Sequence, residues 1–399
     1  MLIGIVGKPS CGKSTFFKAA TLAEAEIASY PFTTIKPNEA VGYIKVECVD
    51  KEFGVQCNPR EGYCIDGNRF VPVKLLDVAG LIPGAHKGLG MGNQFLNDLS
   101  QAQALVHVVD ISGSTNEKGE EVPALSYDPA NDVRFLEEEI DLWYLGLIKK
   151  GWERFARRIV QEKTALHKAL GRNLEGLGVT ENMVEGVIKE RGLDADRPDK
   201  WTDDELKAVA VELRKITKPM IIACNKIDIP GAGDNFERVK KEFPDYIMVP
   251  CSSESELALR EAAKHGLIKY IPGENDFKII DEAKLNEKQR KALDFIKENI
   301  LKRFGSTGVQ EVLDKAAFDL LKLIAIFPGG VGKLQDQNGN YIPDCFLLPE
   351  GSTALDFAYK IHTDLGDKFI RAIDVKKKMT VGKEHKLKHR DVIEIVTSR

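Results

Sequence analysis

A glycine-rich segment near the N-terminus limits this chain to a small group of folds. Residues 7–15 read GKPSCGKST, which fits the pattern GxxxxGK[ST]. The segment follows an apolar run at 2–6, typical of a buried parallel strand, and it leads into a predicted helix over 14–26. A strand, a glycine-rich turn and a helix in this order direct backbone N–H groups towards phosphate. We therefore predict a nucleoside triphosphate site around the loop residues Gly7, Lys8, Pro9, Ser10, Cys11, Gly12, Lys13, Ser14 and Thr15.

The chemistry of such a site assigns roles to two side chains of the loop. Lys13 is expected to bridge the β- and γ-phosphate oxygens, and the Ser14 hydroxyl to ligate Mg²⁺. Cys11 is interpreted as a small loop residue, although a thiol at this position is potentially reactive.

A second motif supplies further contacts to the phosphates. Asp77-Val-Ala-Gly80 ends a predicted strand and reads DxxG. Asp77 is expected to hold Mg²⁺ through water, and the Gly80 N–H to reach a γ-phosphate oxygen. Thr33 and Thr34, in YPFTTIKPN, both offer a hydroxyl for Mg²⁺ and the γ-phosphate, and we favour Thr34. The expected catalytic residues are thus Lys13, Thr34 and Gly80, and the metal ligands Ser14, Thr34 and Asp77.

A third motif predicts which base is bound. Asn225-Lys226-Ile227-Asp228 reads NKxD and follows the apolar run at 219–225. One carboxylate, Asp228, can accept both N–H groups on one edge of guanine, whereas adenine offers no such pair. Asn225 is expected to bond the base and the phosphate loop, and the Lys226 stem to lie against the ring. Cys251-Ser252-Ser253 either directs a backbone N–H to the guanine carbonyl, which would place Ser252 and Ser253 in the site, or caps the next helix.

Alternating apolar runs and helical segments predict an α/β fold with a doubly wound, mostly parallel sheet. The alternation is interrupted between 110 and 219, where apolar residues over 137–163 recur near helical spacing. Beyond 324 the chain reads as short strands and turns around one helix over 353–366, for which Gly366 is the expected C-cap. We predict a nucleotide-binding domain from 1–130 and 205–305, a helical insertion over 131–204, a connecting helix over 306–323 and a small α+β domain over 324–399.

Composition favours a cytoplasmic protein and local contact with nucleic acid. No stretch approaches the roughly 18 apolar residues of a membrane span, and the N-terminus lacks the features of a secretory signal. The formal net charge is −4, but segments 149–172 and 368–390 are rich in Lys and Arg. These segments are interpreted as solvated faces or as local contacts to nucleic acid. Trp152 lies within the first of them, and Trp143 lies shortly before it.

The sparse, odd number of cysteines predicts reduced thiols rather than a disulfide scaffold. Cys48, Cys57 and Cys64 lie within 17 residues but form no CxxC pair. We interpret them as small buried or surface thiols, with a zinc site as the less favoured alternative. His86, in the loop after DxxG, is interpreted as a solvent-facing residue or as a proton carrier near the γ-phosphate.

Taken together, these motifs resemble those of Obg-related translation-factor GTPases, close to the YchF branch. The resemblance rests on GKPSCGKST, YPFTTIKPN, DVAGLIPGAHKGLGMGNQFL and NKID, all within 1–228. Segment 324–399 resembles a TGS domain, a ubiquitin-like β-grasp module, and the helical insertion resembles that of the YchF branch. The resemblance therefore covers nearly the whole chain.

The resemblance implies GTP hydrolysis to GDP and association with ribosomes or structured RNA, with no DNA contact expected. It also implies slow chemistry, because Leu81 follows Gly80 where many GTPases carry the Gln that orients water. The YchF branch often replaces NKxD and favours ATP, whereas NKID is intact here. Relatives that use K⁺ commonly carry Asn where this chain has Ser10, so K⁺ stimulation is in doubt.

The sequence thus favours a translation-associated GTPase switch that uses Mg²⁺ and GTP or GDP. Two alternatives remain: a nucleotide-regulated RNA- or ribosome-binding module with incidental hydrolysis, and a YchF-like ATPase. The oligomeric state is left open.

Overall fold

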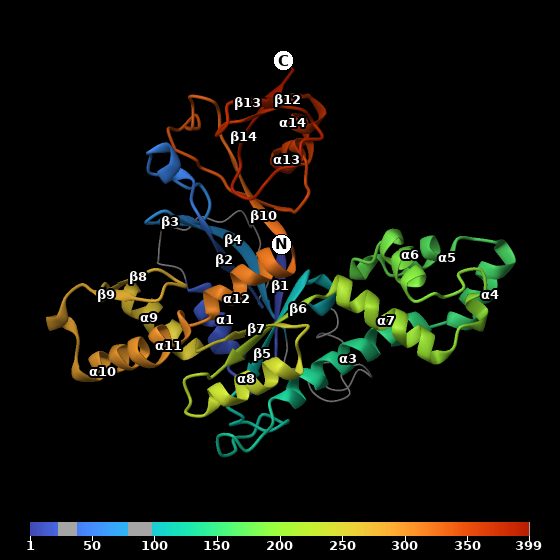
Figure 1. Ribbon diagram of the computed structural model, residues 1–399, viewed down its shortest axis with the longest axis horizontal. Helices are drawn as coiled ribbons and strands as arrows, with labels where there is room; N and C mark the ends of the chain where they lie inside the picture. Colours follow the sequence, from blue (N-terminus) through green and yellow to red (C-terminus); the bar gives the residue numbers. More distant parts are fainter. Residues whose placement is uncertain (23–37, 79–97, 399) are drawn as a thin grey trace. The chain divides into compact units, whose positions relative to one another are not determined.

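We analysed a computed structural model of the chain, in which residues 1–22, 38–78 and 98–398 are described (Figure 1). These residues form two compact units. The first unit comprises Met1–Lys18, Leu75–Ser255 and Thr307–Val309, and the second comprises Ala19–Lys74, Glu256–Ser306 and Gln310–Arg399. Each unit is described separately below.

The first unit is built on a sheet of parallel strands. β1 (Leu2–Val6) pairs with β5 (Ala104–Asp110), β5 with β6 (Met220–Asn225), and β6 with β7 (Ile247–Pro250). The end of β4 (Asn68–Asp77) lies on the other side of β1, where the Val78 N–H donates to Ile5 O at 3.1 Å. Every residue of β5 and β6 is buried, as expected for parallel strands covered on both faces. This confirms the predicted α/β sheet.

The carboxyl ends of these strands carry the predicted motifs. β1 leads into the phosphate loop and α1 (Lys13–Thr21), β4 ends at Asp77, and β6 ends at Asn225. In open α/β sheets, ligands bind at this edge. Two more helices follow strands of this sheet: α8 (Ala232–Glu242) and α9 (Ser253–Lys264).

The predicted helical insertion is present between β5 and β6. The segment 137–163, which shows helical spacing, is divided between two helices at Gly151, whose φ of 77° ends the first of them. The helix over 203–217 has Thr202 as its N-cap, in a capping box. The helices are α3 (Ala130–Lys149), α4 (Trp152–Glu162), α5 (Leu166–Asn173), α6 (Glu181–Glu190) and α7 (Asp203–Thr217), with 3₁₀ turns η3 (Glu175–Leu177) and η4 (Pro198–Lys200).

Two long helices, α3 and α7, run side by side and support the insertion (Figure 1). Arg214, on α7, is almost fully buried and pairs with Glu137 at 2.9 Å and Asp141 at 2.6 Å on α3. Tyr144 and Thr217 share a hydrogen bond of 2.7 Å between the same helices. These polar pairs lie within an otherwise apolar interface and therefore fix the position of one helix against the other.

The second unit begins with three strands and continues with a helical stretch. β3 (Tyr63–Ile65) and β4 form an antiparallel hairpin, and β8 (Ile268–Tyr270) and β9 (Phe277–Ile279) form another. The remaining elements are β2 (Glu39–Glu47), the 3₁₀ turns η1 (Asp50–Phe53) and η5 (Glu282–Lys284), α10 (Glu287–Ile296), α11 (Lys302–Phe304), α12 (Val309–Lys315), and the π-helical turns η6 (Lys297–Leu301) and η7 (Ala316–Leu320).

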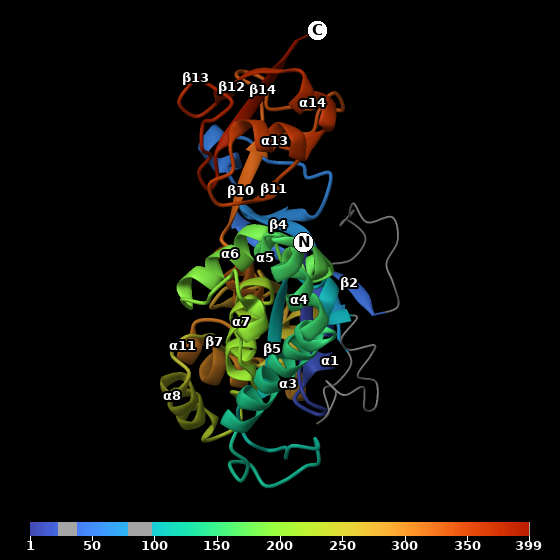
Figure 2. The ribbon, with the colours of Figure 1, turned by 90° about the vertical axis from the view of Figure 1, so that its right-hand side faces the viewer.

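The C-terminal part of this unit is a small mixed sheet, as predicted. The strand order is β11-β10-β14-β12-β13, with β10 and β14 parallel. Phe357 of α13 packs into the apolar core of this sheet, and Figure 2 shows α13 beside it. The elements are β10 (Leu323–Pro328), β11 (Phe346–Pro349), α13 (Ala354–Ile361), α14 (Thr363–Asp367), β12 (Phe369–Asp374), β13 (Met379–Val381) and β14 (Val392–Thr397).

The predicted helix over 353–366 is wrong in one respect. His362 has extended backbone angles, so the helix stops at Ile361 and a new short helix begins at Thr363. The His362 ring accepts a hydrogen bond from the Asp364 N–H at 3.1 Å and thereby caps the second helix. Gly366 lies inside that helix and is not its C-cap. No helix among the described residues has both the length and the apolar character needed to cross a membrane.

Candidate nucleotide-binding site

The phosphate loop follows β1 and is shaped by two glycines. A Cβ at Gly7 would lie 2.6 Å from Val108 O, and a Cβ at Gly12 would lie 2.1 Å from Asn225 Nδ2. Gly12 also has a φ of +90°, a conformation that side chains disfavour. The Phe16 N–H donates to Gly12 O at 2.9 Å and starts α1. Glycine is therefore required at both positions by close approach of the neighbouring strands.

Lys13 and Asp77 form an ion pair at the mouth of the loop. Ser14 is exposed and has no side-chain hydrogen bond within the described ranges. A hydroxyl and a carboxylate are the oxygen ligands that Mg²⁺ prefers, so Ser14 and Asp77 fit the predicted metal site. The predicted Thr34 and Gly80, together with Thr33, Leu81 and His86, lie outside the described residues.

Asn225 ties the phosphate loop to the loop after β7. Its Nδ2 donates to Cys11 O at 2.9 Å, and its Oδ1 accepts from the Ser253 N–H at 3.0 Å and from Ser253 Oγ at 2.8 Å. The predicted bond from Asn225 to the phosphate loop is therefore present. Both functional atoms of the side chain are engaged, so Asn225 fixes two walls of the site at once.

The neighbouring Lys226 is held by a residue that sequence reasoning did not single out. Lys226 Nζ donates to Asp110 Oδ2 at 2.9 Å and to Ser114 Oγ at 3.2 Å. Asp110 ends β5 and is fully buried. Burial raises the pKa of Asp110, but donors on Ser112, Lys226 and Thr115 outweigh burial, so the net pKa is lowered. Asp110 therefore stays ionised and orients the Lys226 stem.

Asp228 is half-buried just beyond β6, in the turn that Lys226 opens with a φ of 62°. Across the parts of the chain that the structure describes, its carboxylate has no hydrogen bond and no ion pair. Both oxygens are thus available to a ligand with two adjacent N–H donors.

The three residues Cys251, Ser252 and Ser253 hold their own loop together. Their N–H groups donate to Cys224 O at 2.8 Å, Thr307 O at 2.9 Å and Asn225 Oδ1 at 3.0 Å, respectively. Ser252 Oγ bonds Ser255 Oγ at 2.8 Å at the start of α9. These contacts favour the capping interpretation over a direct contact to the base.

Comparison with known proteins decides the family. A GTP-binding protein of Methanocaldococcus jannaschii is 53% identical over 398 residues, covering 100% of this chain and 99% of that protein. A GTP-binding protein of Schizosaccharomyces pombe is 40% identical and covers 89% of this chain and 88% of its own. Residues 223–330 match a family model described as "Obg-like GTPase YGR210-like, G4 motif-containing domain".

The chain belongs to the Obg-like GTPase family. Residues 2–136 match a model described as "50S ribosome-binding GTPase", and residues 332–397 match the TGS domain. A crystal structure of a GTP-binding protein from Pyrococcus horikoshii OT3 is 41% identical, covers 100% of both chains and has a TM-score of 0.80. The YchF GTPase of Schizosaccharomyces pombe shares the fold, with a TM-score of 0.59 at 21% identity over 99% of this chain and 97% of its own.

In this Obg-like GTPase, the side chain of Lys8 does not face the phosphates. Lys8 is only 5% exposed; its Nζ lies 2.8 Å from Asp132 Oδ2, donates to Thr115 O at 2.8 Å, and lies 4.0 Å from the centroid of the Tyr127 ring. Lys8 can therefore contact the phosphates only through its backbone N–H, and not through its side chain. Sequence reasoning missed Asp132 because an Asp in the first turn of a helix normally reads as a surface residue.

Cys11 is fully buried beneath the loop, and burial raises its pKa to about 12. A thiol with such a pKa stays protonated and unreactive at neutral pH. This supports the interpretation of Cys11 as a small loop residue.

Both basic segments contain paired cations, and in the first Lys149 pairs with Asp203 at 2.7 Å and Arg157 with Glu153 at 3.5 Å. In the first, Arg154, Arg157 and Arg158 are exposed on α4, whereas Trp143 and Trp152 are buried in the core and cannot stack on bases. Trp152 instead stacks on Trp201, with ring centroids 5.6 Å apart.

In the second basic segment, several cations are already paired. Lys376 pairs with Glu52 at 2.7 Å, Lys377 with Asp374 at 2.6 Å, and Arg390 with Glu47 at 3.0 Å. Six cations of this segment are exposed and have no ion pair within the described part of the chain: Lys368, Arg371, Lys378, Lys383, Lys386 and Lys388. These six, rather than the 376–378 run as a whole, are the charges available to a partner.

Proposed function

We propose that this Obg-like GTPase binds GTP with Mg²⁺, hydrolyses it to GDP, and acts as a switch associated with ribosomes or the translation machinery in the cytoplasm. The observation that carries the choice of guanine is the carboxylate of Asp228, which has no hydrogen bond or ion pair among the described residues, beside an Asn225 that bonds Cys11 and Ser253. Adenine presents no pair of donors to that carboxylate.

The phosphate end of the site supports a hydrolytic mechanism. Lys13, which pairs with Asp77, would contact the β- and γ-phosphates, where its charge would stabilise the transition state. Mg²⁺, when bound, would neutralise charge on the same oxygens. We assign Ser14, Thr34 and Asp77 to hold the ion and the Gly80 N–H to bond the γ-phosphate. When GTP is bound, Asp77 would exchange its contact with Lys13 for one with the hydrated metal.

Ribosome association is supported by the names of relatives. The family model over 2–136 is described as a 50S ribosome-binding GTPase, and the "Ribosome-binding ATPase YchF" of Bacillus subtilis is 26% identical over 92% of this chain. The exposed lysines of the C-terminal module offer phosphate contacts. The runner-up function is a nucleotide-regulated RNA- or ribosome-binding module in which hydrolysis is incidental.

An ATPase activity is the second alternative. The human protein named "Obg-like ATPase 1" is 26% identical over 93% of this chain. The intact NKID, with Asp228 free, favours GTP instead. Direct measurement of GTP and ATP affinities by calorimetry separates the two, and equal affinities would rule out guanine selectivity.

The carboxylate of Asp228 provides a sharper test. In Asp228→Asn, the amide presents one acceptor and adds a donor that faces the base hydrogens, which costs about 1–3 kcal/mol, or roughly 5- to 150-fold in GTP affinity. Xanthine carries a carbonyl where guanine carries its amine, so the variant should gain affinity for xanthosine triphosphate. Asp245→Asn, an exposed change outside the site, is the matched control. Unchanged GTP affinity together with no gain for xanthosine triphosphate would place the base elsewhere.

The switch and the incidental-hydrolysis alternatives are separated by turnover. GTP hydrolysis is measured with and without purified ribosomal subunits. Stimulation by subunits supports a switch, whereas binding of subunits without any change in turnover supports the binding module.

A further inference from the structure

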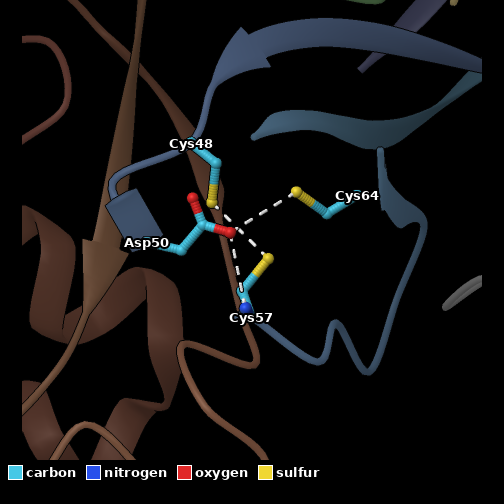
Figure 3. A group of neighbouring side chains, drawn as sticks. All are labelled: Cys48, Asp50, Cys57 and Cys64. Atoms are coloured by element: carbon cyan, nitrogen blue, oxygen red, sulfur yellow. Dashed lines mark hydrogen bonds between the residues drawn. The ribbon is translucent and has the colours of Figure 1, made fainter. Parts of the chain in front are cut away.

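Four side chains outside the nucleotide site converge on one point in the second unit. They are Cys48, Asp50, Cys57 and Cys64, and their ligand atoms all lie within 4.8 Å of one another (Figure 3). Cys48 follows β2, Asp50 opens η1, Cys57 lies in the next loop and Cys64 lies on β3. These four residues are thus close in space, although their spacing along the chain contains no CxxC motif.

The distances fit ligands that share a single ion. Cys48 Sγ lies 3.6 Å from Cys57 Sγ, and Cys64 Sγ lies 3.9 Å from Asp50 Oδ2. Tetrahedral coordination with metal–sulfur bonds of about 2.3 Å separates two sulfurs by about 3.8 Å, and a sulfur and an oxygen by about 3.5 Å. In a [4Fe–4S] cluster each cysteine binds a different iron, so the sulfurs would lie farther apart.

Backbone N–H groups hold the cluster in place. The Cys48 N–H donates to Gly67 O at 2.8 Å, which joins the end of β2 to the turn of the β3–β4 hairpin. Asp50 Oδ1 accepts from the Lys51 N–H at 2.8 Å, and Asp50 Oδ2 accepts from the Cys57 N–H at 3.4 Å. These bonds orient the carboxylate towards the three sulfurs (Figure 3).

The burial of this group calls for a positive charge. Asp50 is 2% exposed, and Cys48 and Cys57 are similarly buried. A buried carboxylate without a cation is costly, and in the described residues no lysine or arginine pairs with Asp50. All three cysteines are free thiols.

A second, independent observation concerns Arg69. Arg69 is the cross-strand partner of Cys64, so both side chains lie on the same face of the hairpin. It is 1% exposed; Nη2 donates to Ile342 O at 2.9 Å, while the buried Nη1 has no hydrogen-bond partner within the described ranges. Three thiolates and a carboxylate around a divalent ion carry excess negative charge, and a buried guanidinium with an unused donor is suited to offset it.

We propose that Cys48, Asp50, Cys57 and Cys64 bind one zinc ion in a closed, four-coordinate structural site. Thiolates select soft or borderline metals over Mg²⁺ and Ca²⁺, and the carboxylate favours Zn²⁺ over Cu(I). All four positions are filled by protein, so the ion has a structural rather than a catalytic role. It joins the end of β2, the loop around Cys57 and the hairpin.

Metal content of the full-length protein is the first test. The protein is purified under reducing conditions, without chelator and without a histidine tag. Elemental mass spectrometry is expected to find one zinc per chain. Cys57→Ser and Cys64→Ser should each lower zinc occupancy at least tenfold after dialysis against a weak chelator. Cys345→Ser, which removes a free cysteine outside the ligand set, should retain full occupancy. Loss of zinc in this control would overturn the ligand set.

A cobalt titration keeps the proposal testable if the serine variants fail to fold. Reduced, zinc-depleted wild-type protein is titrated with Co²⁺, and thiolate-to-metal charge-transfer bands with intense tetrahedral d–d bands should saturate at one equivalent. Asp50→Asn should weaken cobalt binding while leaving the thiolate bands visible. Absence of zinc in the purified protein and of cobalt uptake would refute the site. So would a Cys48–Cys57 disulfide, found by peptide mapping without reductant, in metal-free native protein.

Discussion

At the scale of single residues, a few side chains hold the nucleotide site together through hydrogen bonds and ion pairs. Asn225 bonds both the phosphate loop and Ser253, and Asp110 holds Lys226. Lys8 and Asp132 form a buried pair behind the loop, with Tyr127 Oη donating to Asp132 at 2.9 Å. Buried groups of this kind determine the shape of the loop rather than its chemistry.

Removal of one partner of the buried pair should destabilise the first unit. Lys8→Met leaves the Asp132 carboxylate buried without its cation, which costs about 3–5 kcal/mol. The double variant Lys8→Met with Asp132→Asn removes both charges and should recover most of that loss. Urea unfolding followed by tryptophan fluorescence reports on this unit, since Trp143, Trp152 and Trp201 all lie in it. Equal destabilisation in the single and double variants would show that the pairing contributes little.

The residue after Gly80 sets the expectation for intrinsic turnover. Leu81 cannot orient water, so we expect hydrolysis on the order of 10⁻⁴ to 10⁻² per second. Leu81→Ala should change turnover little, whereas Lys13→Ala should abolish tight nucleotide binding. The rate of GTP hydrolysis in single-turnover assays tests the first expectation, and the GTP affinity of the variant tests the second. A large loss of turnover in Leu81→Ala, with binding retained, would assign the leucine a part in the chemistry.

At the scale of elements, local signals explain where helices begin and end, and tertiary contacts join elements that are distant in the chain. Thr202 begins α7 with a capping box, and Gly151 separates α3 from α4. In the second unit, α12 carries a half-buried Asp314 that accepts hydrogen bonds from the Lys45 N–H of β2 at 2.7 Å and from Gln310 at 2.9 Å. A carboxyl group thus joins a helix to a strand.

The burial of this carboxyl group predicts a pH dependence of stability. Burial raises the pKa of Asp314 from 3.8 to about 7, so the folded state retains a proton that the unfolded chain releases near pH 4. The stabilisation is complete below about pH 4 and is lost as pH rises to about 7. Asp314→Asn stays neutral, so this slope should disappear and the variant should be more stable than wild type at pH 8, by up to about 4 kcal/mol. Thermal unfolding between pH 4 and 8 tests this, and an unchanged slope in the variant would contradict it.

At the scale of the whole molecule, the chain joins a nucleotide-binding unit to a second unit that ends in a β-grasp module. The two basic segments belong to different units, 149–172 to the first and 368–390 to the second. Their paired cations stabilise each unit locally, so the exposed, unpaired cations are the ones suited to contact RNA phosphates.

The exposed lysines of the C-terminal module should carry ribosome association. Reversal of charge at Lys383, Lys386 and Lys388 should weaken cosedimentation with ribosomal subunits, reduce its salt dependence and leave GTP affinity intact. Reversal at Lys376 and Lys377 is the informative comparison, because those residues form ion pairs with Glu52 and Asp374. Wild-type cosedimentation by the triple variant at physiological salt would exclude this segment as the contact.

Sequence alone determined the features that depend on local pattern. GKPSCGKST, DVAG and NKID follow buried strands, and the chemistry of phosphate and guanine requires those residue types in that order. Hydrophobic periodicity predicted the sheet, the insertion and the small C-terminal module, because this periodicity follows the local geometry of helices and strands. The Asn225 bond to the phosphate loop was predictable for the same reason. Both motifs follow strands whose carboxyl ends lie at the same edge of one sheet.

Tertiary structure decided the features that depend on which distant residues meet. The Lys8–Asp132 pair and the Asp110–Lys226 pair join segments more than 100 positions apart, and no local pattern specifies them. The break at His362 depends on a ring that caps the following helix. Cys48, Asp50, Cys57 and Cys64 read as scattered residues until a strand, a 3₁₀ turn and a hairpin bring them together. Such contacts are set by packing in three dimensions, which spacing along the chain does not encode.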